Sequence, residues 1–324
     1  MSRPREDGIV IGKLEPGPRN SVADVGVTVG HVTIERTGVT AVVPPSLPAP
    51  AGTAVLNGAG ELTGSLEIRE WGGLGTPVYL TSTHAVGRVY DGAVSVAMAA
   101  DPSVGVDRVV IPVVGECDDS WLSDARVKHV QPDDVAHAVA DASPDFEQGA
   151  VGAGAGMVCF DWKGGIGSSS RRAGEHTVGV LLLTNFGSSE QLRVDGVPVG
   201  KLLDERPDEA PHPGGSCIAV LATDATLTPS QLERLARRAG LGLARAGSVA
   251  HHGSGEIFVA FATSNERSFR DRELNPLFQA AVDATEEAVL CSLWAAVDTT
   301  GREGRLVRAL PRERVLGLYR GRGR

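Results

Sequence analysis

A polar, breaker-rich loop gives way to an apolar run in the stretch Pro211-His212-Pro213-Gly214-Gly215-Ser216-Cys217-Ile218-Ala219-Val220-Leu221-Ala222-Thr223-Asp224. Gly214 and Gly215 let the backbone bend without a Cβ penalty. The β-prone run that follows predicts a buried strand with the Ser216 hydroxyl at its mouth. Ser216 is therefore a candidate nucleophile, or a candidate new amino terminus if the backbone breaks before it. A plain loop that feeds a core strand would have the same residues, because Gly-Gly-Ser is a common loop sequence.

The composition is that of a globular protein. The 324 residues are 42% hydrophobic and 22% charged, enough for a large core. A net charge of −9 argues against nucleic acid as the main partner. The four scattered cysteines form no Cys-x-x-Cys pair, which predicts reduced, buried thiols in a cytoplasmic protein. We expect no signal peptide and no membrane span, because no run of about 18 apolar residues occurs.

Strand and helix patterns mix along the chain without strict alternation. Residues 1–19 are expected to form a loose arm, and residues 20–324 a single catalytic domain. Besides the run after Ser216, strand patterns cover residues 27–34, 38–43, 54–56, 77–82, 108–114, 176–184 and 257–262. Helical patterns cover residues 65–71, 85–100 and 131–142, and begin again at 228 and 275. A central β layer covered by helices fits this order best.

Polar side chains lie at the ends of three predicted strands. Asn185 ends one strand, Ser216 begins a second, and Ser254 with Glu256 precedes a third. If these strands share a sheet, the four side chains converge. Ser216 Oγ needs a base and a site for the oxyanion. After cleavage of the Gly215-Ser216 bond, the Ser216 α-amine, with a reference pKa of about 7.7–8.0, can take the hydroxyl proton. Asn185 could donate to the oxyanion, and Glu256 could hold Ser254, which orients Ser216.

Ordinary structural roles also suit these residues. Asn185-Phe186-Gly187 fits a turn and residues 253–256 fit a hairpin loop; their coincidence with Ser216 favours function. Zinc at His251-His252, His212 and Glu256 fits poorly, because adjacent histidines point apart on a strand. We therefore expect no metal and no cofactor. The glycine-rich run 149–157 matches a dinucleotide fingerprint only weakly, and a small-residue wall accounts for it better.

A set of further motifs occurs in a fixed order over nearly the whole chain: Asn20 to Gly30, Leu56 to Gly64, Thr83 to Gly87, Pro112 to Glu116, Gly149 to Arg171, Asn185-Phe186-Gly187, Gly215-Ser216 and Ala222 to Ala225. In these motifs the sequence resembles the L-aminopeptidase/D-esterase family, which includes the β-peptidyl aminopeptidases.

The resemblance implies a four-layer αββα sandwich, similar to the N-terminal-nucleophile hydrolases and to ornithine acetyltransferase. It implies self-cleavage at Gly215-Ser216 into residues 1–215 (α-chain) and 216–324 (β-chain), and a homo-oligomer of these cleaved αβ heterodimers. Ser216 would be the nucleophile, Ser254 and Glu256 its support, and Asn185 an oxyanion donor. Many family members place a tyrosine in the substrate pocket soon after the strand that ends at Glu116. Here that position reads Cys117-Asp118-Asp119-Ser120-Trp121, without a tyrosine.

The sequence as a whole predicts a serine aminopeptidase that acts on short peptides, amino-acid amides or esters through an acyl-enzyme. Glu256, Asp118 or Asp119 could hold the substrate amine, and Trp121 is a further candidate contact. One alternative is an acyltransferase resembling ornithine acetyltransferase, whose family uses threonine where this chain has Ser216. A second alternative is a non-catalytic scaffold of the same fold.

The tail after residue 301 carries eight arginines. A nucleic-acid arm is conceivable, but the acidic balance of the chain favours a solvated end. We expect this end to pack its apolar side chains onto a neighbour, namely Leu306, Val307, Val315 and Leu316.

Overall fold

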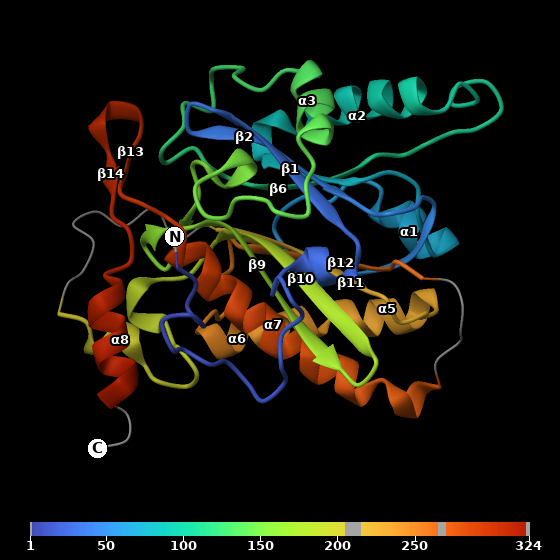
Figure 1. The fold of residues 1–324 in the computed structure, drawn as a ribbon. Helices are drawn as coiled ribbons and strands as arrows, with labels where there is room; N and C mark the ends of the chain where they lie inside the picture. The colour runs from blue at the N-terminus through green and yellow to red at the C-terminus, as the bar shows by residue number, and fades with distance from the viewer. Residues whose placement is uncertain (1, 205–214, 265–269, 322–324) are drawn as a thin grey trace.

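Two β-sheets stack face to face in the computed structural model, which describes residues 2–204, 215–264 and 270–321 (Figure 1). The smaller sheet has the order β1-β2-β5-β6, with β1 Thr28–Ile34, β2 Thr37–Val43, β5 Val78–Ser82 and β6 Val113–Cys117. The larger sheet has the order β4-β3-β12-β11-β10-β9, with β4 Gly73–Leu74, β3 Ala49–Gly58, β12 Gly255–Ala262, β11 Ser216–Thr223, β10 His176–Asn185 and β9 Gly165–Ala173.

Helices cover the outer face of each sheet (Figure 1). The smaller sheet carries α2 (Val86–Ala100) and α3 (Asp133–Ala140), and the larger sheet carries α5 (Pro229–Ala236), α6 (Arg238–Ala246) and α7 (Asn275–Trp294). The remaining helices and strands are α1 Ser65–Trp71, β7 Val158–Cys159, β8 Trp162–Lys163, α4 Val199–Leu202, β13 Thr299–Thr300, β14 Leu306–Val307 and α8 Arg312–Gly321. This is the αββα sandwich that the family resemblance implied, and it refines the single β layer covered by helices that the residue pattern predicted.

Strand β11 explains how one apolar run serves two cores. Ile218 and Val220 join the core between the two sheets, whereas Ala219 and Leu221 join the core under the helices. Successive side chains on a strand point to opposite faces, so a strand buried on both sides needs apolar residues throughout. The uninterrupted apolar run after Ser216 is therefore the signature of a central strand.

The prediction of a loose arm is wrong for residues 2–19. Ile9 and Ile11 are fully buried in the same core as α7 and α8. The Arg3 guanidinium donates to the carbonyl oxygens of Asn20 and Ser168, each at 2.6 Å. Burying an isoleucine side chain contributes about 1.5–3 kcal/mol, which holds a segment that lacks secondary structure of its own.

The apolar residues of the tail also pack differently from the expectation. Val315 and Leu316 of α8 are buried in this chain's own core, and Val307 packs with Leu122 and Val158. Leu306 remains 44% exposed. The tail is thus part of the domain rather than an end that depends on a neighbouring chain for burial.

The strand predicted at residues 108–114 is displaced along the chain. It begins at Val113 and continues through Glu116 to Cys117. Pro112 has no N–H to donate to a sheet, which explains why pairing starts only after it. The shift matters because it places Glu116 on the strand.

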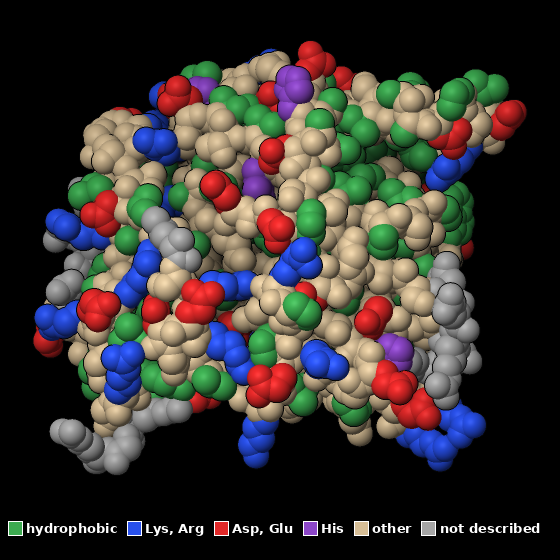
Figure 2. Space-filling model, viewed as in Figure 1, with side chains coloured by type: hydrophobic (Ala, Val, Ile, Leu, Met, Phe, Trp, Pro, Cys, Tyr) green, Lys and Arg blue, Asp and Glu red, His purple; other side chains and the backbone are tan. Residues whose placement is uncertain are grey.

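In the described part of the chain, no helix combines the length and apolar character that crossing a bilayer requires. On the face drawn in Figure 2, basic and acidic side chains are interspersed and do not gather into one basic stripe.

Candidate active site

The sheet topology brings the ends of three strands to one place. Strand β10 runs antiparallel to β11, which pairs Asn185 with Ser216, and β12 runs parallel to β11, which pairs Gly255 with Ser216. The end of β10 therefore meets the starts of β11 and β12 at one edge. Asn185, Ser216 and the Ser254–Glu256 segment lie together there, as the polar strand ends suggested.

Ser216 and the peptide bond before it share one hydrogen-bond donor. The Gly255 N–H lies 3.0 Å from the Gly215 carbonyl oxygen and 3.3 Å from Ser216 Oγ. Gly215 is a glycine for a steric reason: a Cβ there would come within 2.1 Å of the Asn185 carbonyl oxygen. Ser216 is only 6% exposed, so its side chain is largely buried.

Behind Ser216 lies a buried hydroxyl and carboxyl pair. The Ser254 hydroxyl donates a short hydrogen bond to Glu256 Oε1, and both residues are buried. Among the described residues, Glu256 Oε2 has no hydrogen-bond partner. Burial raises the pKa of the Glu256 carboxyl, and the bond from Ser254 opposes that rise. A charge held this way favours a Ser254 oxygen that can accept from a neighbouring hydroxyl.

Asn57 of β3 shapes the loop that carries Ser254. Its Nδ2 donates to the carbonyl oxygens of His251 at 2.9 Å and Ser254 at 2.6 Å. Sequence reasoning did not assign Asn57 a role, although it lies in the Leu56 to Gly64 motif. The only hint in the sequence is a polar residue at the end of an apolar strand. In the structure, Asn57 pairs with Glu256 across β3 and β12.

Asn185 is held on both sides of its amide. Its Oδ1 accepts from the Val158 N–H at 2.9 Å, and its Nδ2 donates to the Asp118 carbonyl oxygen at 2.8 Å. A side-chain amide has two N–H donors, so the second remains available for an oxyanion. The side chain lines the cavity described next.

A cavity of about 930 Å³ opens at this edge. Its lining includes Ser216, Asn185 and Ser254. Asp118 and Trp121, both predicted substrate contacts, also line it. Asp119 does not: it is 2% exposed and lies off this cavity, so its predicted role as an amine holder is wrong. Adjacent residues in a loop point in different directions, and the sequence does not say which of them faces a cavity.

Glu116 is an acidic cavity residue that the sequence reasoning did not single out. It is 3% exposed and lies on β6 beside the cavity. Its carboxylate accepts from the Glu61 N–H at 2.9 Å and from the Thr83 hydroxyl. Burial raises the pKa of the Glu116 carboxyl despite these bonds. Its only signal was its place at the end of the Pro112 to Glu116 motif.

Metal ligands do not cluster in the described residues. No group of three or more His, Cys, Asp or Glu side chains is arranged there to hold an ion. His251 instead contacts the Gln191 side chain, with 3.1 Å between Nε2 atoms. His212, the third histidine of the zinc alternative, lies outside the described residues.

Known proteins match this chain over nearly all of its length. The profile of peptidase family S58 matches residues 20–307. β-Peptidyl aminopeptidase BapA of Sphingosinicella microcystinivorans is 37% identical, covering 94% of this chain and 89% of that protein. A β-aminopeptidase structure from Burkholderia sp. is 40% identical with a TM-score of 0.93, covering 100% of this chain and 99% of the other.

A third relative names the fold. The L-aminopeptidase D-Ala-esterase/amidase of Ochrobactrum anthropi is 34% identical with a TM-score of 0.92, covering 100% of this chain and 99% of that one. It is described as a prototype for the serine aminopeptidases and a variant of the Ntn hydrolase fold.

Two stacked sheets between helical layers, with a serine opening a central strand, define an N-terminal-nucleophile type of hydrolase. The chain belongs to peptidase family S58. The resemblance drawn from the motifs is thereby confirmed, and with it the expectation of a hydrolase of the aminopeptidase class.

Proposed function

We propose that this protein is a self-processing serine aminopeptidase that removes N-terminal residues from short peptides, amides or esters. The observation that carries the proposal is the meeting of Asn185, Ser216 and the Ser254–Glu256 pair at one sheet edge, beside the cavity. A nucleophile, a candidate oxyanion donor and a supporting acid then share one site.

The first reaction would be on the chain itself. Ser216 Oγ attacks the Gly215 carbonyl carbon, its proton passes to the Ser216 nitrogen, and the Gly215-Ser216 C–N bond breaks to leave an ester. Water then hydrolyses the ester, which gives a Gly215 carboxylate and a free Ser216 amine. The hydrogen bond from Gly255 N–H to the Gly215 oxygen supports this step, because it stabilises negative charge on that oxygen.

The second reaction would act on substrates. The Ser216 α-amine takes the hydroxyl proton as Oγ attacks the substrate carbonyl, and returns it to the leaving amine. Asn185 Nδ2 stabilises the oxyanion, and water releases the acyl group from Ser216. Ser254, held by Glu256, orients the Ser216 hydroxyl.

Glu116 and Asp118 are the acids best placed for the free substrate amine. Both line the cavity, whereas Glu256 is not among the residues that line it. A carboxylate on the wall attracts an ammonium group and fixes which end of the substrate enters. Asp118 follows Glu116 closely in the segment where many relatives carry a tyrosine, so it also bears on side-chain preference.

We also propose a cytoplasmic homo-oligomer of cleaved units. Four buried, free cysteines support a reducing compartment. Exposed apolar side chains on β3 and α1 support self-association, measurable by sedimentation: Val55, Leu56, Leu66 and Trp71.

The mass of the purified protein under denaturing conditions tests self-processing. We expect two fragments, residues 1–215 and 216–324, and a single intact chain for Ser216→Ala. Ser120→Ala, another cavity serine, is the matched control and should still be cut. A wild-type chain that stays whole would refute the cleavage. Hydrolysis of aminoacyl p-nitroanilides, absent in Ser216→Ala, tests the peptidase activity separately.

A further inference from the structure

A short hairpin from the C-terminal region supplies two arginines to the cavity. Strands β13 and β14 pair as Thr299 with Val307 and Thr300 with Leu306. The loop between them carries Arg302 and Arg305, and both line the same cavity as Ser216. Neither arginine has a part in the chemistry proposed above.

The Arg305 guanidinium is held in a fixed orientation. Its Cζ lies 4.4 Å from the centre of the Trp121 ring, and Nη1 donates to the Trp121 carbonyl oxygen at 3.2 Å. Nη2 donates to Glu303 at 2.7 Å. Stacking on an aromatic ring and a fixed hydrogen bond limit the rotamers of an arginine before any ligand arrives. Trp121 lines the cavity too, so the stacked pair forms part of its wall.

The two arginines share one carboxylate. Arg302 Nη2 donates to Glu303 at 2.8 Å, and its Nη1 lies 3.9 Å from Asp124. Asp124 is itself bound to Arg126 at 2.9 Å. The ion-paired group therefore has three guanidiniums and two carboxylates, which gives it a net positive charge. Its members are Arg126, Arg302, Arg305, Asp124 and Glu303. Each guanidinium has five N–H donors, more than these contacts use, so an incoming carboxylate can be bound.

The opposite charge lies elsewhere on the same cavity wall. Glu116 and Asp118 come from β6 and the turn after it, whereas Arg302 and Arg305 come from the hairpin. A cavity whose lining carries both carboxylates and guanidiniums matches a zwitterion, which carries an ammonium group at one end and a carboxylate at the other.

We propose that Arg302 and Arg305 bind the C-terminal carboxylate of the substrate, so that the enzyme prefers short peptides with a free carboxyl end. This proposal rests on the aminopeptidase function above. Glu116 and Asp118 bind the substrate amine, and the two hairpin arginines bind its carboxylate. The peptide bond between these two ends then lies at Ser216. Peptides long enough to carry the carboxylate beyond the hairpin lose this contact.

The test compares a dipeptide with its C-terminal amide. In wild type we expect kcat/KM for the free acid to exceed that for the amide by about tenfold, since a charged hydrogen bond contributes about that factor. Arg302→Met and Arg305→Met should bring this ratio close to one. Glu303→Gln removes the competing carboxylate and should raise the ratio. Because the ratio compares two substrates on one variant, any general loss of activity cancels.

Arg314→Met on α8 is the control, because Arg314 does not line the cavity and should leave the ratio at its wild-type value. The preference should also weaken with added salt, which screens a charge contact but not packing against Trp121. A wild-type ratio near one, or a ratio unchanged in the double arginine variant, overturns the carboxylate site.

Failure of the proposed function has a different outcome. If the dipeptide, its amide and an aminoacyl p-nitroanilide all resist hydrolysis, the aminopeptidase function is wrong. Calorimetric binding of the dipeptide and its amide to the wild-type protein, which in that case does not hydrolyse them, then tests the carboxylate site. Tighter binding of the free acid, lost in Arg305→Met, supports the site, and equal binding of both ligands refutes it.

Discussion

Glu256 is a buried carboxyl whose connection to Ser216 runs through the Ser254–Gly255 segment. Its Oε1 accepts the hydrogen bond from the Ser254 hydroxyl, and the Gly255 N–H donates to Ser216 Oγ. Burial raises the pKa of this carboxyl, so it becomes protonated at a higher pH than an ordinary glutamate would. Once protonated, it no longer attracts the Ser254 hydroxyl hydrogen as strongly.

The rate of aminoacyl p-nitroanilide hydrolysis should therefore fall as the pH drops through the raised pKa of Glu256. Glu256→Gln should remove that acidic limb and lower kcat by about tenfold, the cost of a lost charged hydrogen bond. The limb that belongs to the Ser216 amine should remain. Stopped-flow rates across the pH range check this, with surface variant Glu190→Gln as the control. An unchanged acidic limb in Glu256→Gln would exclude Glu256 as its source.

At the level of single residues, the sequence predicted part of the site. Ser216, Asn185 and the Ser254–Glu256 pair could be recognised because each lies at a strand end, where chain direction dictates position. Asp118 and Asp119 could not be told apart. They lie in a turn without periodicity, and only the fold decides that one faces the cavity while the other is buried.

Among the elements, the two-residue strand β8 has an influence beyond its length. Lys163 is fully buried, and its Nζ donates to the carbonyl oxygens of Gly154, Met157 and Gly164 at 2.8–3.0 Å. The first two carbonyls belong to the glycine-rich run 149–157. The residue after Met157 is Val158, whose N–H holds the Asn185 amide.

Lys163→Met should destabilise the fold by about 3 kcal/mol, because three buried carbonyl oxygens lose the hydrogen bond from the ammonium group. The substitution should also lower kcat, because Val158, which follows Met157, would then hold the Asn185 amide less rigidly. Urea unfolding of the Ser216→Ala background, with kcat measured in the parent, checks both effects. Lys201→Met, at an exposed position on α4, is the matched control and should change neither the stability nor kcat. A stable variant with normal kcat would show that the ammonium group is dispensable.

Whole elements were predicted well where burial is continuous and poorly where it is not. Strands β10, β11 and β12 stand out because they are apolar on both faces. The residue pattern misplaced β6, because the β-branched residues before Pro112 lie outside the sheet while Gly115 and Glu116 lie inside it. Glycine and glutamate have low strand preference, and tertiary pairing overrides that preference here.

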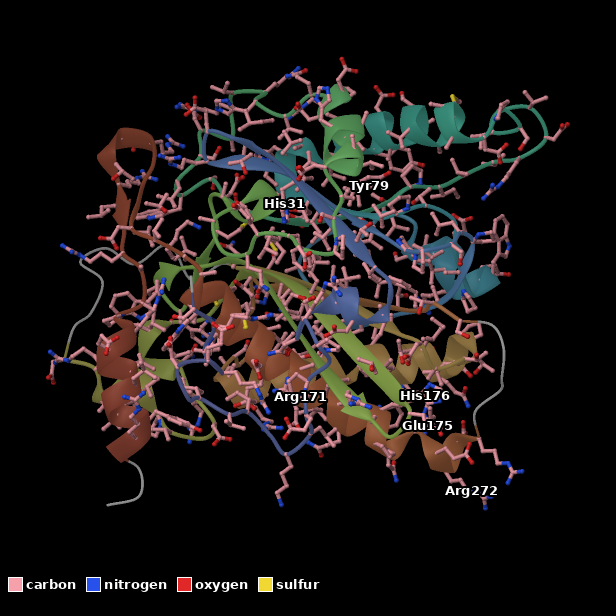
Figure 3. All side chains as sticks on the ribbon, viewed as in Figure 1. His31, Tyr79, Arg171, Glu175, His176 and Arg272 are labelled. Carbon is pink, nitrogen blue, oxygen red and sulfur yellow. The ribbon has the colours of Figure 1, made fainter. Side chains whose placement is uncertain are left out.

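For the molecule as a whole, a buried ionic cluster joins segments far apart in sequence. Arg171 extends from β9 toward α7, where it pairs with Glu287, and both side chains are fully buried (Figure 3). Arg171 Nη2 also donates to the Ile11 carbonyl oxygen at 2.8 Å. Asn20 Nδ2 donates to Glu287 at 2.5 Å. The N-terminal segment, β9 and α7 thus meet at one pair of charges.

Arg171→Met should cost about 3 kcal/mol of unfolding free energy, because it leaves the buried Glu287 with the more distant Arg5 guanidinium, at 4.0 Å, as its counter-charge. Adding Glu287→Leu should restore part of that loss, since a buried pair replaced by apolar side chains is often tolerated. Chemical denaturation of the wild type, Arg171→Met, Glu287→Leu and the double variant measures the coupling. A double variant less stable than Arg171→Met would mean that the remaining carboxylate is not the source of the loss.

The layered architecture could be inferred from sequence, but the position of residues 2–19 could not. These residues are buried against α7 and α8, which lie near the other end of the sequence. No local pattern marks two isoleucines in an irregular segment as core residues. Such contacts become visible only when the chain is folded.

The strand order of the larger sheet has a consequence for the two proposed fragments. Strands β12 and β11 follow the Gly215-Ser216 bond in sequence, yet they lie between β3 on one side and β10 on the other, both of which precede it. Neither fragment contains all the strands of the larger sheet. After cleavage the two fragments would therefore stay associated through the pairing of β3 with β12 and of β10 with β11. Once melted, however, a cut molecule must find its missing half by diffusion. Processing would thus turn a first-order refolding reaction into a second-order one, and recovery from heat would depend on protein concentration.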